Sequence, residues 1–378
     1  MTFREQVRTW LAAHLVGEFA PLVGTGGPGR EHEHVGLRTA WEQELGRGGW
    51  IGLGWPTEVG GRGASIEDQV AFHEEYAQAG GPARIGHIGE QLAGPTLIAF
   101  GSQEQQDRFL PGILAGTELW CQGYSEPGAG SDLAAVRTRA VLQDDGWHVT
   151  GQKVWTSLAH LADWCFVIAR TEDGSERHRG LSFLLVPMDQ PGIEVRPIVQ
   201  LTGTSEFNEV FFDDALTGAD NVVGARGDGW RVAMGLLAFE RGISTLGQQV
   251  GFTREYDEVL ELARRNGTFP DFEDQLVDAW AGLQVLKHQA LRTLDSDAAA
   301  STGVEANVNK LLWAPWHQQL GELAMAVAGP AALLVDRELT PLQNLFLFTR
   351  SDTIYGGSNE VQRNVIAERR WKLPRDRP

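Results

Sequence analysis

The sequence predicts an α+β protein in which a sheet-forming segment lies between two helical regions. Three stretches of different periodicity carry this prediction. Residues 1–117 show the spacing of amphipathic helices, residues 118–220 show short alternating runs separated by turn residues, and residues 221–378 return to the helical period. We therefore expect an N-terminal helical domain, a central β-domain and a C-terminal helical bundle with these boundaries.

The N-terminal region contains two clear helix-start signals. The stretch "SIEDQVAFHEEYAQAGG", residues 65–81, begins with Ser-x-x-Asp and ends at Gly-Gly, as a capped helix does. The stretch "SQEQQDRFLPGILAG", residues 102–116, repeats this pattern. Both stretches predict helices.

The central region has the pattern of strands, and the C-terminal region has the pattern of long helices. Residues 135–157 alternate around an Asp-Asp-Gly turn, which predicts a hairpin. Further short apolar runs follow at regular spacing up to residue 200. Beyond residue 228, long amphipathic stretches cover residues 229–267, 272–294 and 305–329.

Composition and charge exclude several classes of protein. The net charge of −18 argues against a nucleic-acid binder, which needs a basic face to neutralise phosphates. The longest apolar run, "AMAVAGPAALLV", is too short to cross a bilayer, and the N-terminus is no signal peptide. Cys121 and Cys165 stand alone, without metal-ligand spacing, and we expect two free thiols. We expect a cytoplasmic protein that binds no metal and does not associate with membranes.

A glycine-rich segment in the central region is a candidate binding loop. Residues 127–132, "PGAGSD", would let backbone N–H groups approach a planar or anionic ligand, and Ser125 and Ser131 add hydroxyl groups. Downstream, Trp155 offers a flat surface and Ser157 follows on the same side of the expected strand. From the residues alone, a simple turn and a core tryptophan remain the alternatives.

Three segments in the same order resemble the acyl-CoA dehydrogenase family: "SEPGAGSD", "GQKVWTS" and "YGGSNEVQRNVIAER". The resemblance extends over essentially the whole chain. It implies a β-barrel-like central domain, a C-terminal four-helix bundle and FAD as the cofactor. It also implies removal of the α and β hydrogens of an acyl-CoA thioester to give a trans-2-enoyl-CoA, with an electron-transfer flavoprotein as the electron acceptor.

The resemblance further implies which residues hold the ligands. Contacts to the flavin would come from Gln122, Tyr124, Ser125, Gly130, Ser131, Trp155, Thr156, Ser157, Ser358, Asn359 and Glu360. Contacts to the substrate would come from Ser131, Ala238, Arg241, Gly356 and Gly357.

The catalytic base needs a separate argument, because the family usually has a glutamate directly after the tyrosine and this chain has Gly356 there. A glycine keeps the backbone N–H that would hold the thioester oxygen, but it loses the carboxylate. Glu360 matches a flavin contact. Glu240 is the only acidic residue between Asp228 and Glu255 and lies in a mainly apolar helix, although an exposed position is equally open from the pattern.

The resemblance decides between these two acids. Some family members that act on branched or long acyl chains, including actinobacterial ones, carry the base on this helix, just before an arginine. The sequence Phe239-Glu240-Arg241 matches that position. We therefore expect Glu240 to be the base and the acyl chain to be bulky, branched or sterol-derived, which would place the enzyme in lipid metabolism and steroid degradation.

Two departures from the family concern the ADP half of FAD, which homotetrameric members bind with residues of a neighbouring subunit. Asn266 stands where an arginine is usual, although Arg265 lies next to it, and residues 325–329 lack the usual glutamine and first glycine. We expect an α₂β₂ heterotetramer with a homologous second subunit, and a homotetramer remains the alternative. An acyl-CoA oxidase, a flavin monooxygenase and a non-catalytic partner subunit remain alternative functions.

Overall fold

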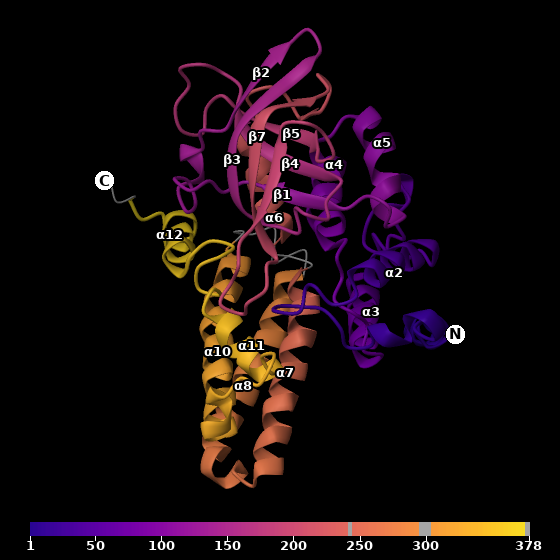
Figure 1. Ribbon diagram of the computed structural model, residues 1–378, viewed down its shortest axis with the longest axis vertical. Coiled ribbons are helices and arrows are strands. Elements are labelled where there is room, and N and C mark those ends of the chain that lie inside the picture. The colour runs from indigo at the N-terminus through magenta and orange to yellow at the C-terminus, as the bar shows by residue number, and fades with distance from the viewer. Residues whose placement is uncertain (241–243, 295–303, 375–378) are drawn as a thin grey trace. The chain divides into compact units, whose positions relative to one another are not determined.

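A computed structural model describes the backbone of residues 1–240, 244–294 and 304–374, and their side chains except those of residues 238–240, 244–246, 293 and 294. The described chain forms two compact units, Met1–Glu240 and Arg241–Pro378, and each is described by itself. Figure 1 shows the helical start, the central sheet and the helical C-terminal region, so the predicted α+β class is confirmed.

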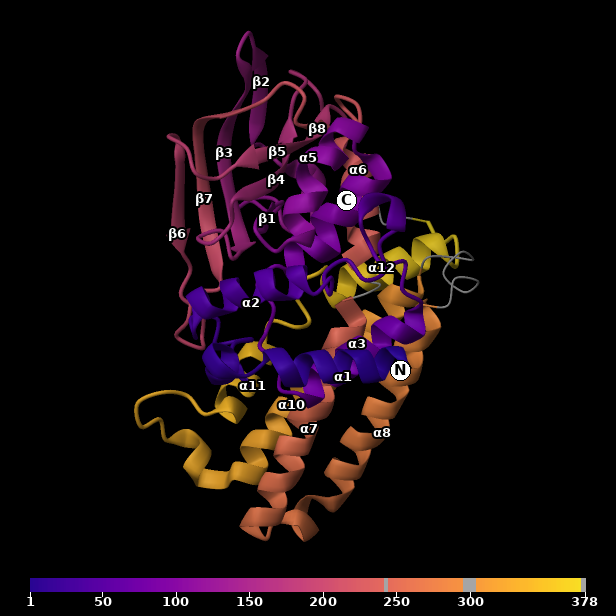
Figure 2. The same ribbon diagram turned by 90° about the vertical axis from the view of Figure 1, so that its right-hand side faces the viewer.

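The N-terminal helices include the two whose starts the sequence predicted, after Ser65 and Ser102. They are α1 (Phe3–His14), α2 (Val35–Arg47), α3 (Ile66–Gln78), α4 (Gly94–Phe100) and α5 (Gln103–Leu114), with short 3₁₀ turns η1 (Gly17–Leu22) and η2 (Thr57–Val59). The Ser65 hydroxyl caps α3 by accepting from the Asp68 N–H, and Ser102 forms a capping box with Gln105 at the start of α5. Helices α1 and α3 pack side by side (Figure 2).

A π-helix, η3 (Gly89–Ala93), runs directly into α4. Both elements pack against α6 (Gly229–Glu240), which also packs against the sheet of the first unit. The approach is close, since a Cβ atom on Gly235 of α6 would lie 2.5 Å from the Phe100 ring. The predicted domain boundary at residues 220/221 therefore precedes a helix that packs with the first unit.

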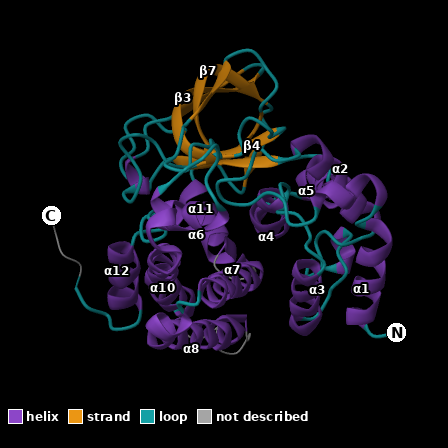
Figure 3. Ribbon diagram, turned by 60° about the horizontal axis from the view of Figure 1, so that its bottom comes forward, coloured by secondary structure: helices purple, strands orange, loops and turns teal. Residues whose placement is uncertain are grey.

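The sheet curls around an apolar interior (Figure 3). Its strands are β1 (Trp120–Gly123), β2 (Arg139–Gln143), β3 (Gly146–Ser157), β4 (Trp164–Arg170), β5 (Leu181–Pro187), β6 (Ile193–Pro197), β7 (Phe207–Thr217) and β8 (Val222–Val223). The order is β6-β7-β3-β2-β4-β5-β8, and β1 pairs with β4 in parallel. The predicted hairpin is β2–β3, in which Gln143 faces Gly146 across the turn. Cys121 and Cys165 are neighbours on β1 and β4, buried and free, as expected.

The second unit is built around α10 (Glu305–Ala328). This helix contacts α7 (Ser244–Asn266), α8 (Phe269–Leu294), α11 (Pro341–Thr349) and α12 (Asn359–Arg369), and it ends at the 3₁₀ turn η5 (Gly329–Leu333). Helices α7, α8 and α10 lie alongside one another, as Figure 1 shows. Within the described part of the chain, no helix is both long and apolar enough to span a membrane.

Candidate functional site

The glycine-rich segment forms a tight turn with open space beside it. The backbone groups of Glu126 and Ala129 bond to each other in both directions, with N···O distances of 3.1 and 3.0 Å. A Cβ atom added to Gly128 or Gly130 would meet no atom within 4 Å. Both glycines are exposed, so a planar ligand can approach this backbone.

A buried ion pair ties this turn to the sheet. The Lys153 side chain of β3 is fully buried, and its Nζ donates to Glu126 Oε1 at 2.9 Å, to the Tyr124 carbonyl at 3.0 Å and to the Ile168 carbonyl at 2.8 Å. All three ammonium protons therefore have acceptors. Burial on its own raises the pKa of Glu126, but the charge of Lys153 and hydrogen bonds outweigh it, so the net pKa is lowered.

Further hydrogen bonds, made by Glu126 and by Val154 of β3, strengthen the link between the glycine-rich turn and the sheet. The two carboxylate oxygens of Glu126 accept from the backbone N–H groups of Arg137 at 2.7 Å and Thr138 at 2.9 Å. The N–H of Val154, next to Lys153, donates to the Ser125 carbonyl at 2.9 Å. The glycine-rich turn and the segment that begins at Lys153 therefore form one hydrogen-bonded assembly.

Trp155 lies on this assembly and is not a core residue. Its side chain is 58% exposed, its φ is +61°, and the register between β3 and β7 shifts between Lys153 and Thr156. A left-handed conformation is unfavourable for a bulky residue and is typical of functional sites. The ring touches Phe207 edge-on, with 6.3 Å between centroids. A flat, exposed indole beside a glycine-rich turn is suited to a planar ligand.

The next residue faces the interior instead. Thr156 is fully buried, and its Oγ1 has no hydrogen-bond partner among the described residues. A hydroxyl that solvent cannot reach is not open to a flavin in this conformation. The open glycine-rich turn and exposed Trp155 do fit a flavin ring system, which is planar and carries hydrogen-bonding edges.

The other predicted residues of the first unit occupy different surroundings. Gln122, Ser125 and Ser157 are half-buried, and Ser131 is exposed. Tyr124 is buried, and its ring meets Phe166 and Phe183 edge-on in the core. A contact from Tyr124 to a cofactor would therefore have to come through its backbone.

In the second unit, two consecutive glycines form a rigid turn before α12. Gly356 and Gly357 have φ values of +62° and +87°. Their carbonyls both accept from the Gln362 side-chain amide, at 2.9 and 3.1 Å. In the part of the chain that the structure describes, the Gly356 N–H donates no hydrogen bond. A fixed turn with a free N–H can stabilise negative charge on a ligand oxygen.

The residues after this turn begin α12. The Ser358 hydroxyl caps the helix by accepting from the Val361 N–H, and Asn359 is buried. The Glu360 carboxylate is 75% exposed and lies 3.7 Å from Arg363. Hydrogen bonds from its own backbone N–H and from Ser358 lower the pKa of Glu360. Exposure and a lowered pKa make Glu360 a weak proton acceptor.

The predicted catalytic base, Glu240, is the last residue of the first described range, residues 1–240. Ala238 and Glu240 are in the last turn of α6, but their side chains are outside the described residues. Arg241 also lies outside them. The role of Glu240 and the substrate contacts of Ala238 and Arg241 therefore stay predictions.

Sequence reasoning missed the ionisable residues that support the two turns, all of which are buried except half-buried Glu255. They are Glu126 and Lys153 in the first unit and Glu255, His317 and Asp352 in the second. One signal was available, because Lys153 occupies an inward position of an alternating strand.

Comparisons with known proteins assign the whole chain to one family. The family models for the N-terminal, middle and C-terminal domains of acyl-CoA dehydrogenases match residues 1–117, 121–215 and 227–370. The chain is 62% identical to acyl-CoA dehydrogenase IpdE1 of Mycobacterium tuberculosis, over 99% of this chain and 98% of that protein.

Two solved structures are similar along the same length. The Tcur3481-Tcur3483 steroid ACAD is 29% identical with a TM-score of 0.86, over 99% of this chain and 97% of that one. The ChsE4-ChsE5 complex of Mycobacterium tuberculosis is 30% identical with a TM-score of 0.80, again over 99% and 97%.

Proposed function

Because the chain belongs to the acyl-CoA dehydrogenase family, we propose that it oxidises the Cα–Cβ bond of an acyl-CoA thioester to a trans-2-enoyl-CoA. The observation that carries this proposal is the hydrogen-bonded assembly that places exposed Trp155 beside the open glycine-rich turn. Such a surface suits a flavin, the usual cofactor of this family.

The FAD contacts proposed in the first unit are the backbone of residues 122–131, Trp155 and Ser157. In the second unit, the family resemblance proposes Ser358, Asn359 and Glu360 as FAD contacts. When bound, FAD supplies the acceptor for the β-hydride and passes the electrons to an electron-transfer flavoprotein. The Lys153–Glu126 pair contributes by fixing the turn against β3.

Glu240 is the proposed base that removes the α-proton. The sequence of its helix, α6, is mainly apolar. A carboxylate that an apolar acyl chain shields from water would be a stronger base. The α-proton is only weakly acidic, so the thioester oxygen needs a fixed donor as negative charge develops on it. The free N–H of Gly356 is suited to that role, and exposed Glu360 is not suited to be the base.

The proposed acyl chain is bulky, branched or sterol-derived. Gly356 has no side chain, and moving the base to another helix leaves that space open to the substrate. The solved structure described as a steroid ACAD supports a bulky acyl chain. A chain-length series against a steroid side-chain thioester, compared by kcat/KM, tests it.

We also propose that a homologous second subunit completes the site for the ADP half of FAD, in an α₂β₂ heterotetramer. Asn266, where an arginine is usual, donates to the Val327 carbonyl at 3.2 Å, so it braces α7 against α10. Val327 lies within residues 325–329, the second segment in which this chain departs from the family pattern. The flavin count after co-expression with the partner tests this: half a FAD per chain supports it, and one FAD per chain in a homo-oligomer contradicts it.

Glu240→Gln tests the base assignment in the enzyme purified with its partner subunit. We expect FAD to stay bound, while dehydrogenation and α-proton exchange with solvent fall roughly 10²–10⁴-fold. Glu261→Gln, which removes an exposed ion pair with Arg264, is the matched control and should keep most of the turnover. If Glu240→Gln stays near wild type while Glu360→Gln loses proton exchange, Glu360 is the base instead.

A further inference from the structure

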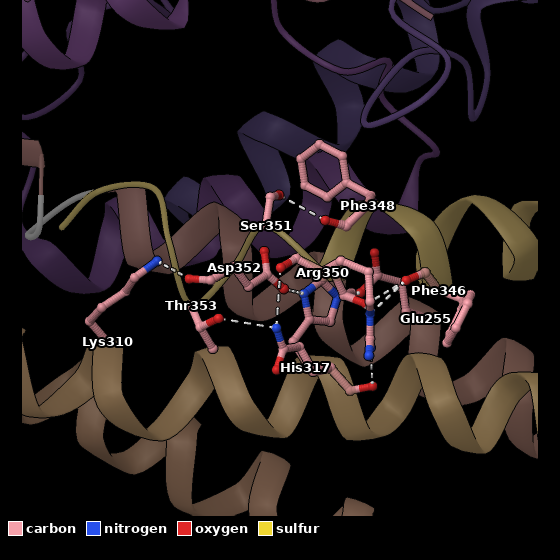
Figure 4. Close-up of polar contacts among 11 residues, drawn as sticks. Glu255, Lys310, His317, Phe346, Phe348, Arg350, Ser351, Asp352 and Thr353 are labelled. Carbon is pink, nitrogen blue, oxygen red and sulfur yellow. Dashed lines mark hydrogen bonds and ion pairs between the residues drawn. The ribbon is translucent and has the colours of Figure 1, made fainter. Parts of the chain in front are cut away.

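A buried polar network anchors the turn that carries Gly356 (Figure 4). The carboxylate of Asp352 is fully buried, and its Oδ2 lies 2.7 Å from Nδ1 of His317 on α10. The other ring nitrogen of His317, Nε2, lies 2.8 Å from Glu255 Oε2 on α7. The Asp352 carbonyl accepts from Lys310 Nζ at 2.6 Å. Three segments of the unit, α7, α10 and the turn, therefore meet at His317.

The imidazole at the centre of this network is positively charged at neutral pH. Burial on its own lowers the pKa of His317, but the charge of Glu255 and the hydrogen bonds to Asp352 and Glu255 outweigh it and raise the pKa to about 9. The other oxygen of Asp352, Oδ1, is buried and has no hydrogen-bond partner within the described residues. Without His317, the Asp352 carboxylate would lose the imidazole that pairs with its Oδ2.

The charged groups around this imidazolium come from every segment that packs on it. Glu255 lies on α7, Lys310 lies on α10, and Asp352 lies in the turn. Arg350, at the start of the turn, faces away toward Glu322, with 2.8 Å between Nη1 and Oε1.

The anchor continues through the backbone up to Gly356. The Ser351 carbonyl accepts from the N–H groups of Ile354 at 2.8 Å and Tyr355 at 3.1 Å. Lys310 Nζ, which also holds the Asp352 carbonyl, lies 4.2 Å from the centre of the Tyr355 ring. The residue directly before Gly356 is therefore fixed on α10, while Gln362 holds the carbonyls of Gly356 and Gly357 from the other side.

We propose that the His317–Asp352 pair is a positioning device that holds the turn 351–357 on α10, so that the Gly356 N–H is presented in one geometry. This inference rests on the proposed function of Gly356 as the donor to the thioester oxygen. His317 acts through the turn and touches no substrate. Loosening the turn should therefore lower the rate of the chemical step more than substrate binding.

The test uses the enzyme with its partner subunit and compares wild type with His317→Gln. Glu261→Gln is the matched control, because it removes an exposed ion pair with Arg264 on α7. Hydrogen exchange of the peptide that contains residues 351–357 is measured by mass spectrometry. We expect at least tenfold faster exchange in His317→Gln and no change in Glu261→Gln. We also expect kcat to fall at least tenfold with KM changed less than threefold.

The pH profile adds a readout that a purely structural function of His317 would not change. In wild type, kcat should fall as the pH passes about 9, the pKa of His317. The protection factor of this peptide, which is the intrinsic exchange rate at the same pH divided by the measured rate, should fall with it. His317→Gln should show no such step. Glu255→Gln keeps the contact to Asp352 and removes one charge, so its step should move to lower pH, and it serves as the variant if His317→Gln fails to fold.

The outcomes separate the inference from the proposed function. An active His317→Gln enzyme with wild-type kcat overturns the positioning inference and leaves the function intact, whatever its hydrogen exchange. A wild-type enzyme that binds thioesters without oxidising them overturns the proposed function and, with it, the catalytic function of Gly356.

Discussion

Lys153 and Glu126 form a buried ion pair that joins the glycine-rich turn to the strand bearing Trp155, with 2.9 Å between Nζ and Oε1. Lys153 precedes Trp155 by two residues, and Glu126 directly follows Ser125. One pair of charges therefore fixes the distance between the two segments that would enclose a flavin ring. This arrangement leads to a first prediction.

Lys153→Met should lower the free energy of unfolding by about 3–5 kcal/mol, because it leaves the Glu126 carboxylate buried without its counter-charge. It should also weaken FAD retention, since the turn loses its tie to β3. Thermal unfolding and the flavin-to-protein absorbance ratio measure the two effects.

Two further variants sharpen this prediction. Glu194→Gln removes an exposed ion pair with Arg196 in the same unit and should change stability by less than about 1 kcal/mol. The double variant Lys153→Met/Glu126→Leu should regain stability without regaining FAD retention. Full FAD retention in the double variant would show that the pair does not position the turn.

Trp155→Ala should cost less than about 1 kcal/mol of unfolding free energy, because the side chain is 58% exposed. FAD binding, measured by fluorescence titration, should nevertheless weaken. Trp147→Ala, on the same strand, is the control: Trp147 is buried, and its loss should cost about 3–5 kcal/mol. Equal costs for the two variants would mean that Trp155 is a packing residue.

Gly356→Ala should lower the unfolding free energy by about 1–2 kcal/mol, because its φ of +62° is left-handed. Gly251→Ala lies on α7 in the same unit, has no positive φ and meets open space, so it should stabilise by up to about 1 kcal/mol. Urea unfolding of both variants measures whether each substitution lowers or raises the free energy of unfolding. Stabilisation by Gly356→Ala would show that the turn adopts another conformation in solution.

The stability of the second unit should decrease at alkaline pH. The pKa of His317 is raised from its ordinary 6.5 to about 9, so its contribution is fully present below pH 6.5 and is lost as the pH rises through 9. The raised pKa corresponds to about 3 kcal/mol as an upper bound. Urea unfolding at pH 6, 7.5 and 9 should show this decline in wild type, and a much smaller one in His317→Gln. A flat wild-type profile would mean that the imidazole is neutral.

Features set by a few neighbouring residues could be predicted from the sequence. The caps at Ser65 and Ser102 need only the side chain and the next turn of helix, and the β2–β3 hairpin needs only its turn and alternating residues. The order of helical and strand-forming segments gave the α+β class for the same reason.

Features that depend on distant residues could not be predicted. Glu126 and Lys153 are 27 residues apart, and Asp352 and His317 are 35 apart; each pair meets only after the fold forms. The same limit applies to Tyr124, whose motif suggested a ligand contact but whose ring fills space beside Phe166 and Phe183. For Trp155, the sequence is compatible with either a core residue or a ligand contact, because the exposure of its side chain depends on how the whole sheet folds.

The π-helix η3 at Gly89–Ala93 accommodates one extra residue at the start of the helix that continues as α4. A π turn contains about one residue more than an α turn, so η3 is equivalent to a single insertion within a helix. Deleting one residue there would convert the π turn into an α turn and leave α4 in register, so Thr96 and Leu97 would stay buried. A one-codon difference at this point in a relative is therefore absorbed inside the helix and need not change which side chains α4 turns toward α6.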